Sequence, residues 1–483
     1  MNPNNFADRV ARSGVAFGTS GARGLVADMT DELCYAYASA FLQTVASGAN
    51  TLVLGHDLRP SSPRMAVACA AAAAAHGARV IYAGALPTPA LAYYAAQLRV
   101  PALVITGSHI PFDRNGIKFY RADGEISKAD EQAMLAATVE LPASLDLAAL
   151  PEPDAQVAQA YVQRYTQFFG SQALVGMRVA VYEHSSVGRD IIGQILHALG
   201  AQVLPLGRTD VFVPIDTEAV RPEDIAQARA WAAEHRFDAI VSTDGDADRP
   251  LLGDERGQWL RGDVVGILCA QFLRAQVVVT PVSSNTALEK SGAFAQVLRT
   301  RIGSPYVIAG MDTALAAQMQ DAAVQAGPVV GFEANGGFLL ASDVLQHGRK
   351  LAALPTRDAV LPMLALLSLA RQRGSLLSDL SADLPKRFTA SDRLQAFATE
   401  KSRTLIQNLL ADAARMAATL APGAGAVAEV DQTDGLRVTF ANQDIVHLRP
   451  SGNAPELRCY AESATVESAK ALCDACLARI GQL

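Results

Sequence analysis

The stretch ITGSHIPFDRNGIK (residues 105–118, the serine loop) places a serine, a histidine and a lysine in a segment too rich in glycine and proline to be a helix. Ser108 is a candidate nucleophile, but Ile110 replaces the final glycine of the G-x-S-x-G motif of serine hydrolases. A serine can instead carry a phosphoryl group, which adds a charge of about −1.5 to −2. Lys118 is then a candidate for proton transfer, with its pKa lowered if it is desolvated. His109 either shares that role or orients the loop. The alternative is a serine that only caps a turn.

A second segment, STDGDADRP (residues 242–250, the aspartate loop), places Asp244, Asp246 and Asp248 directly after an apolar run. Alternate residues of an extended chain point the same way, so the three carboxylates are expected to converge at the end of a strand. They would repel one another, and a hard divalent cation with oxygen ligands, Mg²⁺ rather than zinc, would relieve that repulsion. An EF-hand fits poorly, because Arg249 stands where its glycine is required. A solvated acidic turn is the alternative.

A third segment, RPSGNAPELRCY (residues 449–460, the arginine turn), surrounds a Ser-Gly-Asn turn with two arginines. Such a turn offers backbone N–H groups and a hydroxyl to phosphate oxygens, and guanidinium groups bind phosphate with two hydrogen bonds each. The candidate phosphate-binding residues are Arg449, Ser451, Gly452, Asn453 and Arg458. An ordinary polar turn between two strands is the alternative.

Three further segments carry weaker signals. In GFEANGGF (residues 331–338, the glycine turn), Glu333 and Asn335 could hold two adjacent hydroxyl groups of a sugar, and the glycines let a ligand approach the backbone. A plain β-turn is the alternative. FGTSGARG and GHDLRPSS supply Arg23 and Arg59, either of which could be a surface residue. Arg59 is expected to brace neighbouring loops rather than touch a substrate.

Strands and helices that alternate along the chain would position these loops. TLVLGHDLRPSSPRMAVACAAAAAAHGARVIYAG predicts a strand, a loop, a helix and a strand, and RVAVYEHSSVGRDIIGQILHALGAQVLPLG repeats this plan. The alternation favours parallel strands covered by helices. In contrast, GLRVTFANQDIVHLRPSGNAPELRCYAES alternates apolar and polar residues, as an antiparallel sheet does. We therefore expect an α/β protein with three similar α/β domains, each with a mixed sheet, and a smaller C-terminal α+β domain.

Linker-like segments indicate the domain boundaries. ELPASLDLAALPEPDAQ, from Glu140, is rich in proline and acidic residues, and GDERGQWLRGD, from Gly253, is turn-like. LSADLPKRFTASDRL precedes the terminal region. The expected domains are residues 1–148 with the serine loop, 149–256 with the aspartate loop, 257–372 with the glycine turn and 373–483 with the arginine turn.

The composition limits the class of protein. The chain has 483 residues, 50% hydrophobic and 18% charged, which is typical of a folded enzyme of several domains. A net charge of −7 gives a nucleic-acid partner no overall electrostatic support. The six scattered cysteines suit a reducing cytoplasm, and Cys473 and Cys476 are expected to be ordinary positions of a helix.

No membrane association is expected. The N-terminal segment lacks the apolar core of a signal peptide, and the alanine run from Ala66 is too short to span a bilayer. A cytoplasmic protein is the prediction.

Taken in order, the segments resemble the loops of the α-D-phosphohexomutases, the family of phosphomannomutase and phosphoglucomutase. TGSHIPFDRNGIK resembles the phosphoserine loop of that family, DGDADR the metal loop, GFEANGG the sugar loop and RPSGNAPELRCY the phosphate loop. FGTSGARG resembles its N-terminal loop, so the resemblance spans nearly the whole chain. It implies a heart-shaped molecule of four domains around a central cleft that receives one loop from each domain.

The resemblance also implies a role for each candidate residue. The catalytic residues would be Ser108, Lys118, His109, Arg23 and Arg249. The ligands of Mg²⁺ would be Asp244, Asp246, Asp248 and a phosphoserine oxygen at Ser108. The substrate would be bound by Glu333, Asn335, Arg449, Ser451, Gly452, Asn453 and Arg458. Asn335 and Gly337 depart from the serine and the histidine that the family often has in its sugar loop.

The implied activity is the interconversion of hexose 6-phosphate and hexose 1-phosphate. Phosphorylated Ser108 would phosphorylate the free hydroxyl of the sugar, and the resulting hexose 1,6-bisphosphate would return its other phosphate to Ser108. The motifs look most like the phosphomannomutase branch, with phosphoglucomutase as the alternative and phosphoglucosamine mutase as a weaker one. A Mg²⁺-dependent sugar phosphatase is the alternative from another class.

The partners implied are small hexose phosphates, which also serve as the 1,6-bisphosphate activator. A monomer or a weak homodimer is expected, in carbohydrate metabolism and nucleotide-sugar biosynthesis. No nucleic acid and no membrane are expected as partners.

Overall fold

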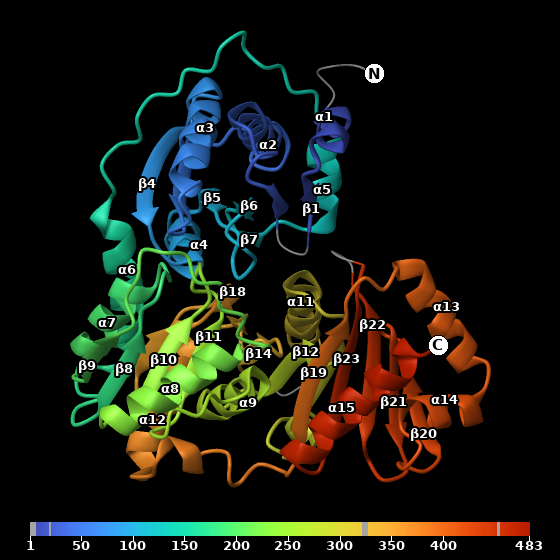
Figure 1. The fold of residues 1–483 in the computed structure, drawn as a ribbon. Coiled ribbons are helices and arrows are strands. Elements are labelled where there is room, and N and C mark those ends of the chain that lie inside the picture. The colour runs from blue at the N-terminus through green and yellow to red at the C-terminus, as the bar shows by residue number, and fades with distance from the viewer. Residues whose placement is uncertain (1–5, 19–20, 321–326, 452–454) are drawn as a thin grey trace.

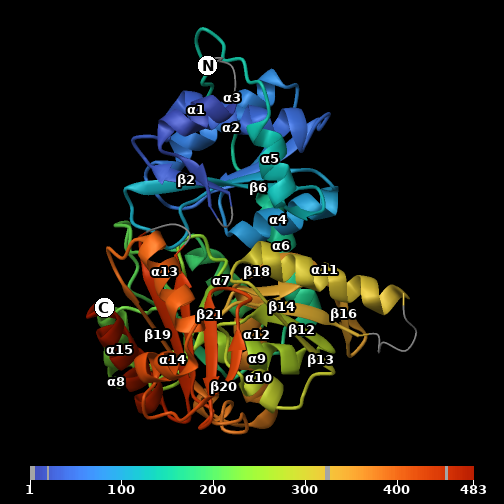
Figure 2. The same ribbon diagram turned by 90° about the vertical axis from the view of Figure 1, so that its right-hand side faces the viewer.

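The computed structural model describes residues 6–18, 21–320, 327–451 and 455–483. Over these ranges the chain forms four consecutive units, each built around its own main sheet (Figures 1 and 2). Three of the main sheets are mixed and the last is antiparallel, which confirms the predicted fold class. The boundaries after residues 148, 256 and 372 stay a prediction.

The first unit, blue to teal in Figure 1, carries the serine loop. Its helices are α1 (Phe6–Ser13), α2 (Asp31–Thr44), α3 (Ser62–Ala75), α4 (Thr88–Leu98) and α5 (Lys128–Leu135). Its strands are β1 (Ala16–Phe17), β2 (Ala22–Leu25), β3 (Thr51–His56), β4 (Arg79–Ala85), β5 (Ala102–Ile105), β6 (Arg114–Arg121) and β7 (Gly124–Glu125). They form one sheet in the order β1-β2-β6-β5-β3-β4, with β7 beside β6. The serine loop connects β5 to β6, two central strands, which fixes both of its ends.

Local sequence explains the paired helices of this unit. The Thr30 side chain accepts a hydrogen bond from Leu33 N, and Asp31 and Glu32 in the first turn complement the helix dipole at the start of α2. The alanine run lies in α3, which packs on α2 in a core with small side chains. No helix of the described ranges is long and apolar enough to cross a membrane.

The second unit carries the aspartate loop. Its helices are α6 (Ala155–Phe169), α7 (Arg189–Ala198) and α8 (Pro222–Glu234). Its strands are β8 (Arg178–Tyr182), β9 (Gln202–Leu206), β10 (Ala239–Thr243) and β11 (Pro250–Gly253), in the order β11-β10-β8-β9. The aspartate loop joins β10 to β11, which pair antiparallel.

The third unit carries the glycine turn. Its helices are α9 (Gly262–Phe272), α10 (Ala287–Lys290), α11 (Ser304–Gln320), α12 (Val360–Arg373) and the 3₁₀ helix η1 (Leu377–Asp379). Its strands are β12 (Val277–Pro281), β13 (Gln296–Thr300), β14 (Val329–Phe332), β15 (Phe338–Leu340), β16 (Val344–Gln346), β17 (Arg349–Leu351) and β18 (Leu354–Asp358). The main sheet has the order β13-β12-β14-β15-β18, and β16 pairs with β17 apart from it.

The second and third units share one apolar core. Val179 and Val241 of one sheet and Phe332 and Phe338 of the other belong to the same buried cluster. Burial of this shared surface is the main stabilising contribution to the contact between the units. The strands that carry the aspartate loop and the glycine turn are therefore packed on the same apolar core.

The fourth unit, red in Figure 1, has a five-stranded antiparallel sheet in the order β19-β23-β22-β21-β20. Its strands are β19 (Phe388–Leu394), β20 (Val427–Asp431), β21 (Leu436–Phe440), β22 (Ile445–Pro450) and β23 (Leu457–Ser463). Its helices are α13 (Thr399–Leu410), α14 (Ala413–Leu420) and α15 (Val466–Gly481). Cys473 and Cys476 are free, buried positions of α15, as predicted.

Candidate active site

Three of the four predicted loops meet through direct contacts. The Ser108 hydroxyl donates to Asp244 Oδ2 at 2.6 Å, which joins the serine loop to the aspartate loop. Arg357 on β18 donates to both Asp248 and Glu333, which joins the aspartate loop to the glycine turn. Residues predicted from separate motifs are thus brought together in one place.

Ser108 is held in an uncommon backbone conformation. It is fully buried and has a φ of 53°, in the left-handed region that few non-glycine residues occupy. Its N–H donates to Thr106 Oγ1 at 2.8 Å, and its carbonyl accepts from Arg59 Nη2 at 2.8 Å. Such strain persists only where surrounding contacts impose it, and it is concentrated at functional sites.

Arg59 braces the serine loop, as predicted. It is buried, and its Nε is paired with Asp57 at 3.1 Å. Its two terminal nitrogens donate to four carbonyl oxygens of the loop, those of Ser108, Ile110, Pro111 and Arg114. The guanidinium group therefore sets the path of the loop without reaching a ligand itself.

Replacing Arg59 with lysine is expected to lower kcat by about 10- to 100-fold, because an ammonium group cannot make this set of hydrogen bonds and small displacements of a reacting atom are costly. Steady-state kinetics of the variant beside Arg403→Lys, an exposed control on α13, measures the effect. A wild-type kcat for Arg59→Lys would contradict the bracing role.

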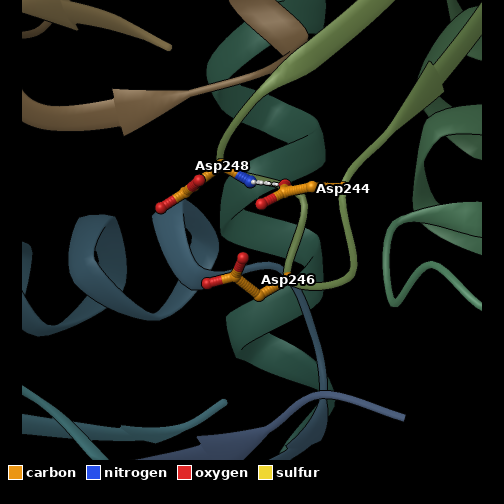
Figure 3. A group of neighbouring side chains, drawn as sticks. All are labelled: Asp244, Asp246 and Asp248. Carbon is orange, nitrogen blue, oxygen red and sulfur yellow. Dashed lines mark hydrogen bonds between the residues drawn. The ribbon is translucent and has the colours of Figure 1, made fainter. Parts of the chain in front are cut away.

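The three aspartates lie on one loop with their carboxyl groups turned to the same side (Figure 3). A ligand atom from each lies within 4.8 Å of the others, so the predicted convergence is confirmed. The predicted reason is wrong, because the loop is a turn rather than an extended strand. Ala247 has a φ of 57°, and Asp248 N donates to Asp244 Oδ1 at 3.3 Å.

The aspartates keep free oxygen atoms that suit a cation. Asp246 Oδ1 and Asp248 Oδ1 are buried and accept no hydrogen bond among the described residues, although Arg249 Nε lies 3.6 Å from Asp248 Oδ1. Buried oxygens without donors are costly unless a ligand satisfies them. Burial and the neighbouring Asp246 and Asp248 carboxylates raise the pKa of Asp244 well above its usual range, so a cation bound beside it would favour its charged form. The donor set therefore fits a hard divalent ion.

Lys118 lies between two of these carboxylates. Its Nζ donates to Asp246 Oδ2 and to Asp248 Oδ2, both at 2.6 Å. Burial alone would lower its pKa, but the two carboxylates outweigh burial and raise the pKa above the ordinary lysine value. The predicted lowering of this pKa is therefore wrong in this structure, where Lys118 is an ammonium group that partly neutralises the aspartates.

His109 and two arginines also lie near the serine and the aspartates. Arg249 Nη1 lies 3.1 Å from His109 Nδ1, and because arginine only donates, that nitrogen is the acceptor of a neutral imidazole. Burial and Arg249 lower the pKa of His109 well below its ordinary value. Arg23 lies on β2. Its burial and the positive charges of Arg249 and Arg357 lower its pKa to about 10. It remains a cation at neutral pH.

Arg357 is a site residue that the sequence patterns missed. It is buried, with Nη2 2.9 Å from Asp248 Oδ2 and Nη1 3.1 Å from Glu333 Oε2. No local motif surrounds it, since it lies at the end of β18 in an ordinary LPTRD strand. A Cβ on Gly337 would lie 2.6 Å from Arg357 Cδ, so Arg357 occupies space that a side chain at position 337 would need.

Asn335 is also buried here, and its Oδ1 accepts from Gly337 N.

The arginine turn places its two arginines directly opposite each other. Arg449 on β22 and Arg458 on β23 are register partners, and Arg393 on β19 is the partner of Arg458 on its other side. Like charges placed opposite one another are destabilising unless an anion lies between them. Arg449 forms an ion pair with Asp434 at 2.8 Å and Arg458 a longer one with Glu456 at 3.9 Å, and the buried Nε of each arginine makes no hydrogen bond among the described residues.

Two predicted residues of this turn, Gly452 and Asn453, lie outside the described residues. Ser451 is described and buried, and its N–H donates to Glu456 O at 2.9 Å. Arg458 and Arg249 both lower the pKa of Glu218 on the second unit, although burial and Asp216 outweigh them. Arg458 of the arginine turn and Arg249 of the aspartate loop therefore both act on Glu218.

The pH dependence of stability has a clear source beside Arg449. His447 Nε2 donates to Asp434 O at 2.6 Å, and burial, opposed by Asp434 and assisted by the charges of Arg437 and Arg449, lowers its pKa from 6.5 to about 4. The unfolded chain binds this proton below pH 6.5, whereas the folded chain binds it only near pH 4. Stability is therefore lost as the pH falls through this window, by about 3 kcal/mol.

His447→Gln is expected to remove that part of the pH dependence, because the glutamine amide can reach the position of Nε2 and donate to the carbonyl of Asp434 but does not titrate. Unfolding free energies of both proteins at pH 6.5 and pH 4 measure it. An identical loss of stability in the two proteins would show that His447 is not its source.

Comparison with known proteins places this geometry in a family. Four sequence families, described as the alpha/beta/alpha domains I, II and III and the C-terminal domain of phosphoglucomutase/phosphomannomutase, match residues 14–142, 159–257, 261–388 and 397–478 in that order. The chain belongs to the phosphoglucomutase/phosphomannomutase family. The resemblance predicted from the loops is therefore confirmed over most of the chain.

Relatives within the family match along nearly their whole length. A phosphomannomutase of Salmonella muenchen is 46% identical over 99% of this chain and 98% of its own. A phosphomannomutase of Sinorhizobium fredii is 45% identical over 95% of this chain and 97% of its own. A solved family structure from Burkholderia thailandensis covers 96% of this chain and 97% of its own with a TM-score of 0.74, at 20% identity, and so shares the fold. Members of this family are isomerases that move a phosphoryl group on a sugar.

Proposed function

We propose that this protein is a phosphomannomutase that interconverts mannose 6-phosphate and mannose 1-phosphate through a phosphoryl group carried by Ser108. The observation that carries the proposal is the strained, buried Ser108, whose Oγ lies 2.6 Å from Asp244 in the aspartate cluster. The full-length relatives at 46% and 45% identity, both phosphomannomutases, support mannose as the sugar.

In the proposed reaction the P–O bond to Ser108 breaks while a bond forms from the free sugar hydroxyl to phosphorus. The hydroxyl proton passes to a base, for which the candidates are the neutral His109 and Lys118 once Mg²⁺ has neutralised the carboxylates beside it, and the departing Ser108 oxygen takes up a proton. The reverse transfer from the other phosphate of the bisphosphate restores phosphorylated Ser108. Arg23 and Arg249, which interact electrostatically with carboxylates of the aspartate loop, would stabilise the charge that spreads over the transferring group.

Mg²⁺ is the proposed cofactor at Asp244, Asp246 and Asp248. Bound there with a phosphoserine oxygen, it would neutralise the phosphoryl oxygens and the carboxylates that now raise the pKa of Lys118. The Oδ1 atoms of Asp246 and Asp248, which accept no hydrogen bond among the described residues, support it. A solved Aspergillus fumigatus N-acetylphosphoglucosamine mutase, 15% identical with a TM-score of 0.57, is a complex with GlcNAc-6P and magnesium.

The substrate is proposed to lie between the glycine turn and the arginine turn. Glu333 and Asn335 would bind sugar hydroxyls, and the paired arginines with the turn between them would bind the phosphate that does not react. A hexose 1,6-bisphosphate is the proposed intermediate and activator, and a serine-to-alanine variant of the Aspergillus enzyme is a complex with glucose 1,6-bisphosphate. We further propose that the protein acts in the cytoplasm as a monomer or weak homodimer.

The test is kcat/KM for mannose 1-phosphate and glucose 1-phosphate, measured side by side with Mg²⁺ and catalytic hexose 1,6-bisphosphate. Isomerisation of both with a higher value for mannose is expected. A higher value for glucose would replace phosphomannomutase with phosphoglucomutase, and release of inorganic phosphate without isomerisation would replace both with a phosphatase.

A further inference from the structure

A segment of the second unit that no motif identified reaches two of the site loops. Residues 207–221 connect β9 to α8. The ring of Phe212 lies under Arg59, with the guanidinium carbon 4.1 Å from the ring centroid. Further along, Thr217 is buried and its hydroxyl donates to Asn335 O at 2.7 Å. The segment therefore contacts both the brace of the serine loop and the glycine turn.

The hydrogen bond from Thr217 fixes the glycine turn from outside. The turn makes two backbone hydrogen bonds of its own, Glu333 N to Gly337 O and Gly336 N to Glu333 O. Within the described ranges, Thr217 supplies the one hydrogen bond that the backbone of residues 333–337 accepts from another part of the chain. A buried hydroxyl–carbonyl bond of this kind also leaves a costly unsatisfied carbonyl if its donor is removed.

Thr217 is itself held on both sides. Asp216 Oδ1 accepts from Glu218 N at 3.0 Å, and Arg261 Nη1 donates to Glu218 O at 3.0 Å. The next residue after Arg261 packs on the glycine turn, because a Cβ on Gly262 would lie 2.6 Å from Ala334 O. The turn is thus confined between the start of α9 and Thr217, so that Thr217 sets the orientation of its central peptide.

That orientation decides what Asn335 offers a ligand. Its Oδ1 already accepts from Gly337 N at 2.9 Å, which leaves the amide N–H groups as its free donors. We propose that Thr217 is a positioning residue of the hexose-binding turn, which acts through the Asn335 peptide to aim these donors at a sugar hydroxyl. This inference rests on the proposed function, in which the glycine turn binds the sugar.

The experiment compares Thr217→Val, which keeps the shape of the side chain but removes the donor, with Thr217→Ser, which keeps the donor. We expect Thr217→Val to lower kcat/KM about tenfold through KM, and Thr217→Ser to stay within about twofold of wild type. The kcat/KM of Thr217→Val should fall by the same factor for both hexose 1-phosphates, because mannose and glucose differ at C2 and share the hydroxyls at C3 and C4. Inhibition by inorganic phosphate should not change, because the arginine turn is untouched.

The matched control is Thr44→Val, which removes a hydroxyl–carbonyl bond of the same 2.7 Å length in α2, far from the site along the chain. A double-mutant cycle with Asn335→Ala adds a second readout: Thr217→Val should have no further effect on KM once the Asn335 side chain is gone. The cycle can also be run with Thr217→Ala if the valine variant does not fold.

Three results would overturn the inference. They are a wild-type KM for Thr217→Val, weaker phosphate inhibition in step with the higher KM, and additive effects of the two changes in the cycle. A wild-type protein that isomerises neither sugar phosphate would instead overturn the proposed function, so the two failures are distinguishable.

Discussion

Ser108→Ala is expected to abolish isomerisation of both sugar phosphates, with kcat lower by at least about four orders of magnitude. The reason is chemical, because the variant has no oxygen at this position to carry the phosphoryl group between the two halves of the reaction. The charged groups around it, from Asp244 to Arg249, remain in place. Binding of hexose 1,6-bisphosphate should therefore stay within about tenfold of wild type while turnover disappears.

The control for Ser108→Ala is Ser39→Ala. Ser39 is also a buried serine of the first unit, and its hydroxyl has no hydrogen-bond partner in the described part of the chain. Its loss should leave kcat unchanged. Calorimetric titration with the bisphosphate and a coupled assay of both variants separate binding from turnover. Turnover of Ser108→Ala above about a ten-thousandth of wild type would mean that another group carries the phosphoryl.

Arg357→Met has the second-largest expected effect, on stability as well as activity. Arg357 is buried and makes ion pairs with Asp248 at 2.9 Å and Glu333 at 3.1 Å, so a neutral side chain leaves two buried carboxylates without this partner. Removing one member of a buried ion pair typically costs about 3–5 kcal/mol. Because the same pairs join the aspartate loop to the glycine turn, kcat/KM should fall by about 100-fold or more.

Arg357→Lys separates charge from geometry, since lysine keeps the charge but cannot bridge two carboxylates with a planar fork. It should recover most of the stability and little of the activity. Urea unfolding and kinetics of both variants, with Arg403→Met as the exposed control, make the comparison. If Arg357→Met matches the control in stability and in kcat/KM, Arg357 does not link the two loops.

Much of the site could be predicted because its chemistry is concentrated in short loops. Ser108, the three aspartates and the two arginines of the arginine turn each lie in a segment whose composition restricts its role. The alternation of strands and helices could also be predicted, because the spacing of apolar residues along the chain differs between a helix and a strand. These signals need no knowledge of how the units pack.

What the sequence did not predict depends on contacts between units. Arg357 follows Glu333 along the chain without a motif of its own, and its role exists only because β18 ends beside the aspartate loop. The pKa of Lys118 rises because two carboxylates from another unit outweigh burial. Thr217 acts on a residue of the next unit. Distances across a fold of this size are set by tertiary packing, which composition and spacing do not encode.

Transfer of a labelled phosphoryl group tests the central claim most directly. The protein would be incubated with hexose 1,6-bisphosphate carrying isotopic phosphorus, and the labelled residue identified by peptide mapping before and after addition of unlabelled mannose 1-phosphate. We predict that the label appears on Ser108 alone and then leaves it for the sugar phosphate pool. Label on another residue, or label that leaves only as inorganic phosphate, would contradict a mutase that works through Ser108.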